Sequence, residues 1–290
     1  MSAMSRVIAL FVMAAVAGCA ATTPEAQPSP TVDPKVQQQR VEAAKADCMK
    51  RKGFTYTAFV WPEPTEDPEV VKGRSGDYAL MKTYREKYGF GVFSMIVHPG
   101  MFGAKARSIG EDSPDPNHKV MQKLSEKQRM AYQDAAESCY GQAVKQVLGK
   151  EVKGVFDHYE KTMKAMEELR NRELNGDARL VELAAATAAC LKDKGYRVDS
   201  AQPVAVAKRG RDEFGKEMSK FQKEMGGGKG MGKVMALEIT PEQAKPLLDK
   251  EIKAALDDLE CGRAFYAEYQ PKSLALQTRV KGEYGVDVRE

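Results

Sequence analysis

The side chains of this 290-residue chain that could most readily do chemistry are its five cysteines. They lie at Cys19, Cys48, Cys139, Cys190 and Cys261. No two of them form a Cys-x-x-Cys pair, so neither a redox-active dithiol nor a zinc knuckle is indicated. Cys19 stands apart near the N-terminus. The other four are an even number, which is typical of disulfide-bonded thiols in an oxidising compartment.

The residues before Cys19 resemble an export signal with a lipid-attachment site. An uncharged run of 11 residues, 7–17, follows Arg6. At 1.5 Å per residue this run is too short to cross a bilayer of about 30 Å, but it fits the apolar region of a signal. It leads into Val-Ala-Gly-Cys, which resembles the lipobox of bacterial lipoproteins, where the signal is cut before a cysteine whose sulfur takes a diacylglyceryl group. We therefore predict a signal peptide over residues 1–18 and lipidation of Cys19; a short buried helix with an incidental cysteine is the alternative.

The segment after the signal has the composition of a tether. Residues 19–34 contain the modified cysteine and a stretch rich in Pro, Thr, Ser and Gln. Such a stretch reaches at most about 45 Å where it is polyproline-like. Two acyl chains of the palmitate type anchor a protein stably where one is marginal. We therefore expect a lipid anchor on Cys19 at the cell membrane, with the folded part on the extracytoplasmic side.

An internal repeat suggests how the other four cysteines pair. Residues 44–54, AKADCMKRKGF, align with residues 186–196, ATAACLKDKGY. Each copy is typical of the last turns of a helix ended by glycine, and a second helix with a cysteine follows later. Four cysteines allow three pairings, and spacing alone does not choose among them. A duplicated unit most simply closes on itself, which predicts Cys48–Cys139 and Cys190–Cys261; four unrelated buried thiols are the alternative.

Apolar periodicity and capping residues predict a mainly α-helical fold. Asp33, followed by a proline, is typical of a helix start, and Ser125 and Thr240 each begin a capping box. Apolar residues then recur at intervals of three and four. Because proline interrupts a helix interior, we expect the last long helix to break at Pro271.

The sequence predicts two related, disulfide-linked helical halves with at most a small β element in the first half. The first helical repeat covers residues 35–150, a connecting helix covers 151–176, and the second repeat covers 177–290. Two segments of the first half are predicted strands. Segment 54–61 alternates aromatic and β-branched residues with others, which is typical of a strand or an extended edge, and segment 92–97, which is short and apolar, could form a second short strand.

Two loop segments carry weaker signals for ligand binding. Residues 227–233 match GxxxxGK, a phosphate-binding pattern, but Val234 stands where a Mg²⁺-binding Ser or Thr is needed. A flexible basic loop is therefore favoured. The acidic residues Glu111, Asp112 and Asp115 could offer oxygen ligands to Ca²⁺, but their spacing is not that of an EF-hand. A solvated loop is favoured there.

Other potential ligands and nucleophiles are scattered along the chain. Tyr56, Phe59 and Trp61 could line a groove for sugar or peptide, although packing is the favoured interpretation. Gly-x-Ser-x-Gly and Ser-x-x-Lys, two patterns of serine nucleophiles, are absent. Three histidines are too few and too widely spaced for a histidine-rich metal site: His98, His118 and His158. Six methionines could ligate copper, but packing in a core or a position in a loop is the favoured interpretation of them: Met163, Met166, Met218, Met225, Met231 and Met235. No cofactor and no metal are predicted.

Several short motifs carry a family resemblance. They are CMKRKGFTY at 48–56, KYGFGV at 87–92, LSEKQRMAY at 124–132 and EIKAALDDLEC at 251–261. Over residues 40–270 they resemble exported lipoproteins of actinomycete-type bacteria, in which CMxxxGF, YGxG and LSxxEQxAY precede a cysteine in that order. Lys127 stands where that family usually has Glu, a minor departure. The family has no established activity, so no substrate or catalytic residue is carried over.

These features together predict a membrane-anchored lipoprotein of the cell envelope. We expect a binding or interaction module with an extracellular or envelope partner, and no enzymatic activity. The formal net charge of +4 is spread along the chain, so no nucleic-acid partner is indicated. A cell-envelope assembly factor and a cell-wall-acting enzyme with an unrecognised site are the alternatives.

Overall fold

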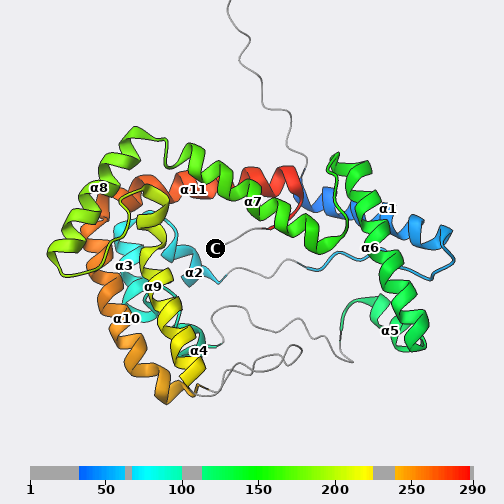
Figure 1. The fold of residues 1–290 in the computed structure, drawn as a ribbon, viewed down its shortest axis with the longest axis horizontal. Coiled ribbons are helices and arrows are strands. Elements are labelled where there is room, and N and C mark those ends of the chain that lie inside the picture. The colour runs from blue at the N-terminus through cyan, green and yellow to red at the C-terminus, as the bar shows by residue number, and fades with distance from the viewer. Residues whose placement is uncertain (1–32, 63–66, 100–112, 225–238, 288–290) are drawn as a thin grey trace, which may run out of the picture. The chain divides into compact units, whose positions relative to one another are not determined.

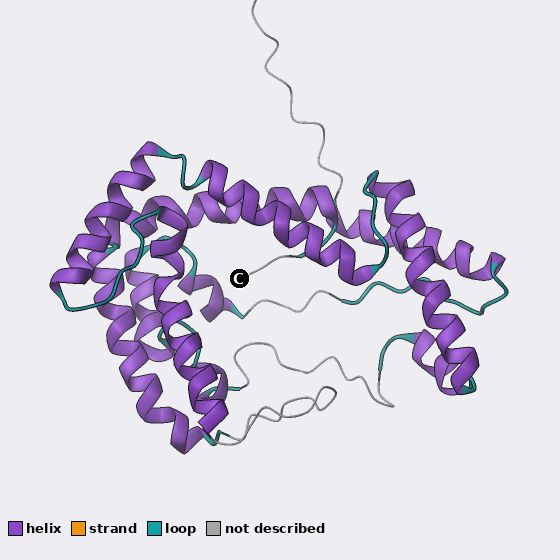
Figure 2. Ribbon diagram, in the orientation of Figure 1, coloured by secondary structure: helices purple, strands orange, loops and turns teal. Residues whose placement is uncertain are grey.

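The protein is mainly α-helical, as predicted. A computed structural model describes four ranges, which contain helices and no strand (Figure 2): 33–62, 67–99, 113–224 and 239–287. The predicted signal peptide 1–18, Cys19 and the tether up to residue 32 lie outside these ranges. So do Glu111, Asp112 and the GxxxxGK segment.

The helices follow one another along the chain as labelled in Figure 1. Their bounds are α1 Pro34–Arg51, α2 Pro68–Gly73, α3 Tyr78–Tyr88, α4 Ser94–Val97, α5 Pro116–Gln122, α6 Glu126–Leu148, α7 Val155–Glu173, α8 Ala178–Asp193, α9 Pro203–Glu224, α10 Pro241–Cys261 and α11 Arg263–Tyr284.

Local sequence signals set several helix ends. The side chains of Asp33, Ser125 and Thr240 each accept a hydrogen bond from a backbone N–H in the first turn of α1, α6 and α10. Both predicted capping boxes are confirmed. Gly53 and Gly195 follow α1 and α8 at φ +83° and +84°, a backbone conformation that glycine adopts without the steric cost of a Cβ. The two copies of the repeat therefore end their helices in the same way.

Both predicted disulfide bonds are present. Cys48–Cys139 joins α1 to α6, and Cys190–Cys261 joins α8 to α10. The Cα atoms within each pair lie 5.5 Å and 5.6 Å apart, a separation that a disulfide spans without backbone movement. Each bond closes a long loop, of 91 and 71 positions, and in the chain-entropy model stabilises the fold by about 4 to 5 kcal/mol.

Residues 35–150 contribute to more than one group of packed helices. Around the first disulfide, α1, α5 and α6 share a core that includes Tyr132. By contrast, α3 and α4 pack against α10, and Phe93 shares a core with Leu248. Helices α7 and α11 lie side by side (Figure 1). Segment 67–97 thus packs with the helices that the second disulfide joins. The domain boundaries at 150 and 177 stay predictions.

Neither predicted strand forms. In segment 54–61 the backbone N–H of Thr57 donates to Asn117 Oδ1 at 2.8 Å, and Asn117 Nδ2 donates to the Thr57 carbonyl at 2.8 Å. One amide side chain therefore makes both hydrogen bonds that a neighbouring strand would make. Segment 92–97 ends in the short helix α4 because the N–H groups that lead into it bind a buried carboxylate, Glu251.

The predicted break at Pro271 is also wrong. The helix is broken at Gly262, between α10 and α11, and α11 runs through the proline. Pro271 leaves the carbonyl of Ala267 without its usual helical donor. The backbone at Gly76 packs over this place: a Cβ added there would lie 3.3 Å from Pro271 Cδ and 3.5 Å from the Ala267 carbonyl oxygen. Packing around the proline thus supports a helix that sequence rules would end.

A buried histidine joins α6, α7 and α11. His158 is 2% exposed, its Nδ1 lies 2.9 Å from the Tyr140 hydroxyl, and its ring contacts that of Tyr284. Burial lowers the pKa of His158 below its ordinary value of 6.5; Asp157 opposes this shift and two nearby lysines, Lys150 and Lys161, add to it.

This lowered pKa predicts a loss of stability in mild acid. Below about pH 6.5 the unfolded chain takes up a proton that the folded chain does not, so the free energy of unfolding falls as the pH falls, by at most about 1.4 kcal/mol per pH unit. Urea unfolding at several pH values should show a steeper fall for the parent than for His158→Gln. The same dependence of the unfolding free energy on pH in both proteins would contradict a lowered pKa of His158.

Candidate functional site

A cavity of about 260 Å³ opens between α2, α3, α9 and α11. Its lining combines charged, aromatic and amide side chains. The four cationic side chains are Arg74, Arg85, Lys208 and Arg211, and the carboxylate is Asp212. Three tyrosines and three uncharged polar residues complete the polar lining: Tyr84, Tyr266, Tyr269, Gln270, Ser273 and Gln277. Cations therefore outnumber carboxylates four to one in this lining.

A buried carboxylate on α10 fixes the helices that form the cavity. Asp258 is fully buried, and its Oδ2 accepts hydrogen bonds from Arg85 Nη1 at 2.7 Å and from the Tyr266 hydroxyl at 2.6 Å. Arg85 Nη1 also donates to the Ala255 carbonyl at 2.7 Å. A third donor, Arg209 Nη2 on α9, lies 3.5 Å from Asp258 Oδ1. Helices α3, α9 and α11 are thus all tied to one residue of α10.

The tyrosine of this network stays protonated. Burial, together with the negative charge of Asp258, raises the pKa of Tyr266. The Tyr266 hydroxyl therefore remains a hydrogen-bond donor to the carboxylate over the whole physiological pH range.

A second buried carboxylate holds the glycine-rich turn beside the cavity. Glu251 is fully buried, and its Oε1 accepts the N–H groups of Phe90 and Val92 at 2.8 Å and 2.9 Å, while Oε2 accepts that of Phe93 at 2.8 Å. Gly89 adopts φ +61°, and a Cβ there would lie 2.8 Å from Glu251 Cγ. Only glycine allows the backbone to wrap so closely around the carboxylate.

This contact gives the Tyr-Gly-x-Gly segment a structural role. Gly89 and Phe90 line the cavity, and they take their positions from Glu251. Burial raises the pKa of Glu251, whereas the donated N–H groups act to lower it. Turn and carboxylate lie 161 positions apart in the sequence, from Phe90 to Glu251.

The cavity contains polar groups whose bonding is incomplete. Gln277 Oε1 is buried without a hydrogen-bond partner among the described residues. Arg211 is exposed and makes no hydrogen bond or ion pair within the same ranges. Burial raises the pKa of Tyr84, and the nearby charges of Arg211 and Arg74 act to lower it, so both arginines are close to that tyrosine. No Ser–His pair, Cys–His pair or pair of carboxylates occurs among the residues that line the cavity.

Most residues considered from the sequence lie away from this cavity. Tyr56 is buried against Tyr132, and its hydroxyl donates to Glu42 at 2.8 Å, so it packs in a core. Met166 and Met218 also lie in cores. In the part of the chain that the structure describes, no group of three His, Cys, Asp or Glu side chains could hold a metal ion.

Sequence reasoning missed the two buried carboxylates. Glu251 and Asp258 are seven positions apart, so they share one face of α10 with Leu248 and Ala255. Charged residues on an otherwise apolar helical face were the available signal. That signal did not identify their partners, which lie on other helices far away in the chain.

Comparison of the chain with protein-family models, curated proteins and solved structures found no match. Among the helices in the described ranges, none is both long enough and apolar enough to cross a membrane.

Neighbouring aspartates on α10 provide a matched test of the buried network. Asp258→Asn should destabilise the fold by about 3 to 5 kcal/mol, because Arg85 would remain buried without a countercharge, whereas Arg209 would keep its ion pair with Glu213. Asp257 is partly exposed and accepts from Tyr196, Lys194 and Lys253, whose cations stay in contact with solvent, so Asp257→Asn should cost about 1 kcal/mol or less. Urea unfolding of both variants measures these losses. Equal losses would show that Asp258 does not hold the cavity together.

Proposed function

We propose that this protein is an exported lipoprotein, anchored at the cell membrane through Cys19, that binds a small molecule on the extracytoplasmic side of the cell envelope. The Val-Ala-Gly-Cys sequence that ends at Cys19 supports the anchor. The two disulfide bonds support export, because such bonds persist in oxidising compartments and are rare in the cytosol.

The cavity between α2, α3, α9 and α11 is the observation that carries the binding function. Ligand sites are typically concave, with apolar and aromatic walls and a few fixed polar groups. Here three tyrosines provide the aromatic walls, and the Asp258 and Glu251 networks hold the surrounding helices before any ligand arrives. Such preorganisation reduces the cost of ordering side chains on binding.

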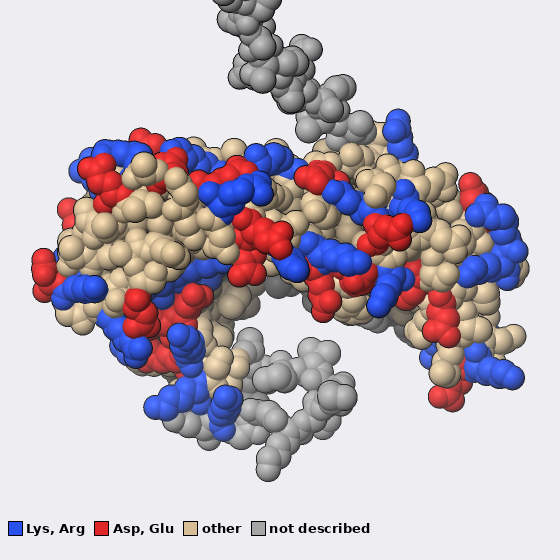
Figure 3. Space-filling model, turned by 45° about the horizontal axis from the view of Figure 1, so that its top comes forward, with Lys and Arg blue, Asp and Glu red and all other residues tan. Residues whose placement is uncertain are grey.

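The distribution of charge also favours a local site over an extended polyanion. Lys, Arg, Asp and Glu are interspersed over the face drawn in Figure 3. A nucleic-acid surface normally groups its cations on one face or stripe. Four cationic side chains instead line one cavity of small volume.

The anchor is tested by Cys19→Ser. Because the thioether needs the sulfur of Cys19, this variant should lose labelling by a palmitate analogue and leave the membrane fraction of the expressing bacterium. Ser29→Ala, a change in the tether, should behave as the parent. Retention of Cys19→Ser in the membrane fraction together with its label would reject the anchor.

The binding function is tested by filling the cavity. Ala207 lines the cavity, so Ala207→Trp should exclude a bound molecule, whereas Ala275→Trp on the exposed side of α11 should not. Native mass spectrometry of the full-length protein taken from its own membranes should show a small-molecule adduct that only Ala207→Trp loses. An adduct that persists in Ala207→Trp, or no adduct in the parent, would contradict binding in this cavity.

A further inference from the structure

The cations and the uncharged polar groups of the cavity come from different elements. Arg74 follows α2, Lys208 and Arg211 lie on α9, and the glutamine and serine side chains lie on successive turns of α11. A ligand in contact with both sets must therefore combine a negative charge with groups that bond to amides and hydroxyls.

Arg211 is the cation of this lining that an anionic ligand would pair with. Asp212 is the single carboxylate among the described lining residues. Arg85 has its own countercharge in Asp258, which is why it contributes structure rather than free charge. Arg211 makes no ion pair with any described residue and is thus the side chain from which a carboxylate or phosphate gains most.

The glutamine on α11 requires a hydrogen-bond donor. The buried Gln277 Oε1 has no partner in the described ranges, and a buried acceptor without a donor costs about 1 to 3 kcal/mol as a general magnitude. A ligand ammonium group could donate there, but the surrounding cations repel it. A hydroxyl group donates without adding positive charge. A hydroxylated anion therefore fits the cations and Gln277 better than an amino acid does.

The size and aromatic walls of the cavity favour a single sugar ring. About 260 Å³ is slightly below the range of about 300 to 1,000 Å³ that is typical of sites for drug-sized ligands. Tyr84 and Tyr269 line the cavity with aromatic side chains, which commonly contact the C–H groups of a sugar, while Gln270 and Ser273 provide hydrogen-bonding groups for its hydroxyls.

We propose that this cavity binds an acidic monosaccharide, one sugar ring with a carboxylate or phosphate group, whose anionic group pairs with Arg211 and whose hydroxyl donates to Gln277 Oε1. The proposal rests on the binding function above and specifies the class of ligand. The carboxylate and the phosphate share the same recognition by arginine, and the experiment distinguishes them.

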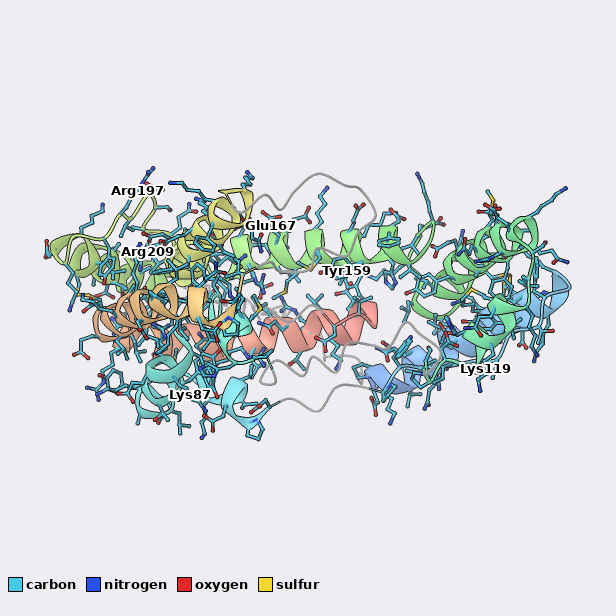
Figure 4. The ribbon with its side chains drawn as sticks, turned by 90° about the horizontal axis from the view of Figure 1, so that it is seen from below. Lys87, Lys119, Tyr159, Glu167, Arg197 and Arg209 are labelled. Carbon is cyan, nitrogen blue, oxygen red and sulfur yellow. A yellow bond between two sulfur atoms is a disulfide. The ribbon has the colours of Figure 1, made fainter. Side chains whose placement is uncertain are left out.

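Isothermal titration calorimetry of the full-length protein in detergent tests the proposal with glucuronate, glucose 6-phosphate and neutral glucose. At least one of the two acids should bind saturably, and glucose should bind at least about tenfold more weakly because it lacks the charge. Arg211→Ala and Gln277→Leu should each weaken binding of that acid about tenfold or more. Arg197→Ala removes an exposed arginine that projects away from the helices (Figure 4) and should leave the affinity unchanged.

The outcomes separate the ligand class from the binding function. Circular dichroism and thermal melting identify any variant that has lost its fold, so a loss of affinity in a folded variant supports the proposal. Saturable binding of only one acid assigns the carboxylate or the phosphate. Failure of both acids to bind, equal binding of glucose, or affinity unchanged by both cavity variants overturns the acidic sugar. In that case an adduct lost only in Ala207→Trp still supports the binding function. The absence of that adduct from the parent protein would overturn both the binding function and the proposed ligand class.

Discussion

The structure around the cavity depends on two buried carboxylates on one face of α10. Buried charges are costly unless they are paired or hydrogen-bonded: Asp258 is paired with arginines, and Glu251 accepts hydrogen bonds from backbone N–H groups. Asp258 accepts hydrogen bonds from side chains on three helices, those of Arg85, Arg209 and Tyr266. Glu251 accepts hydrogen bonds from three backbone N–H groups in the turn before α4. Because neither carboxylate is satisfied without these partners, α10 specifies where α3, α9 and α11 lie.

This arrangement explains why the two related halves differ. When the repeat is aligned on its second cysteines, Cys139 and Cys261, the positions of Asp258 and Glu251 correspond to Ala136 and Arg129. Helix α6 therefore lacks the acceptors that α10 offers to the glycine-rich turn and to Arg85. Segment 67–97, although it lies between the cysteines of the first half, packs on α10 for this reason. The two halves thus share the same pattern of disulfide bonds, but their cysteine-bearing helices α6 and α10 pack against different neighbours.

The same networks give the cavity its chemical character. Arg85 is neutralised by Asp258 and forms part of the wall, its guanidinium lying 4.6 Å from the centre of the Tyr266 ring. The charge that remains available lies on side chains of the more exposed rim, such as Arg211. Fixed aromatic walls with a cationic rim suit the recognition of an anion, and this is the physical basis of the proposed binding function.

The sequence by itself determined the features that depend on neighbouring residues or on the repeat. Asp33, Ser125 and Thr240 cap helices within one turn, and the repeat gave the pairing of Cys48 with Cys139 and of Cys190 with Cys261. Only the tertiary structure decided that 54–61 and 92–97 are not strands, that α11 continues through Pro271, and that a cavity forms. Those outcomes depend on contacts such as Arg85 with Asp258, 173 positions apart, and no local pattern encodes which distant donor satisfies a buried acceptor.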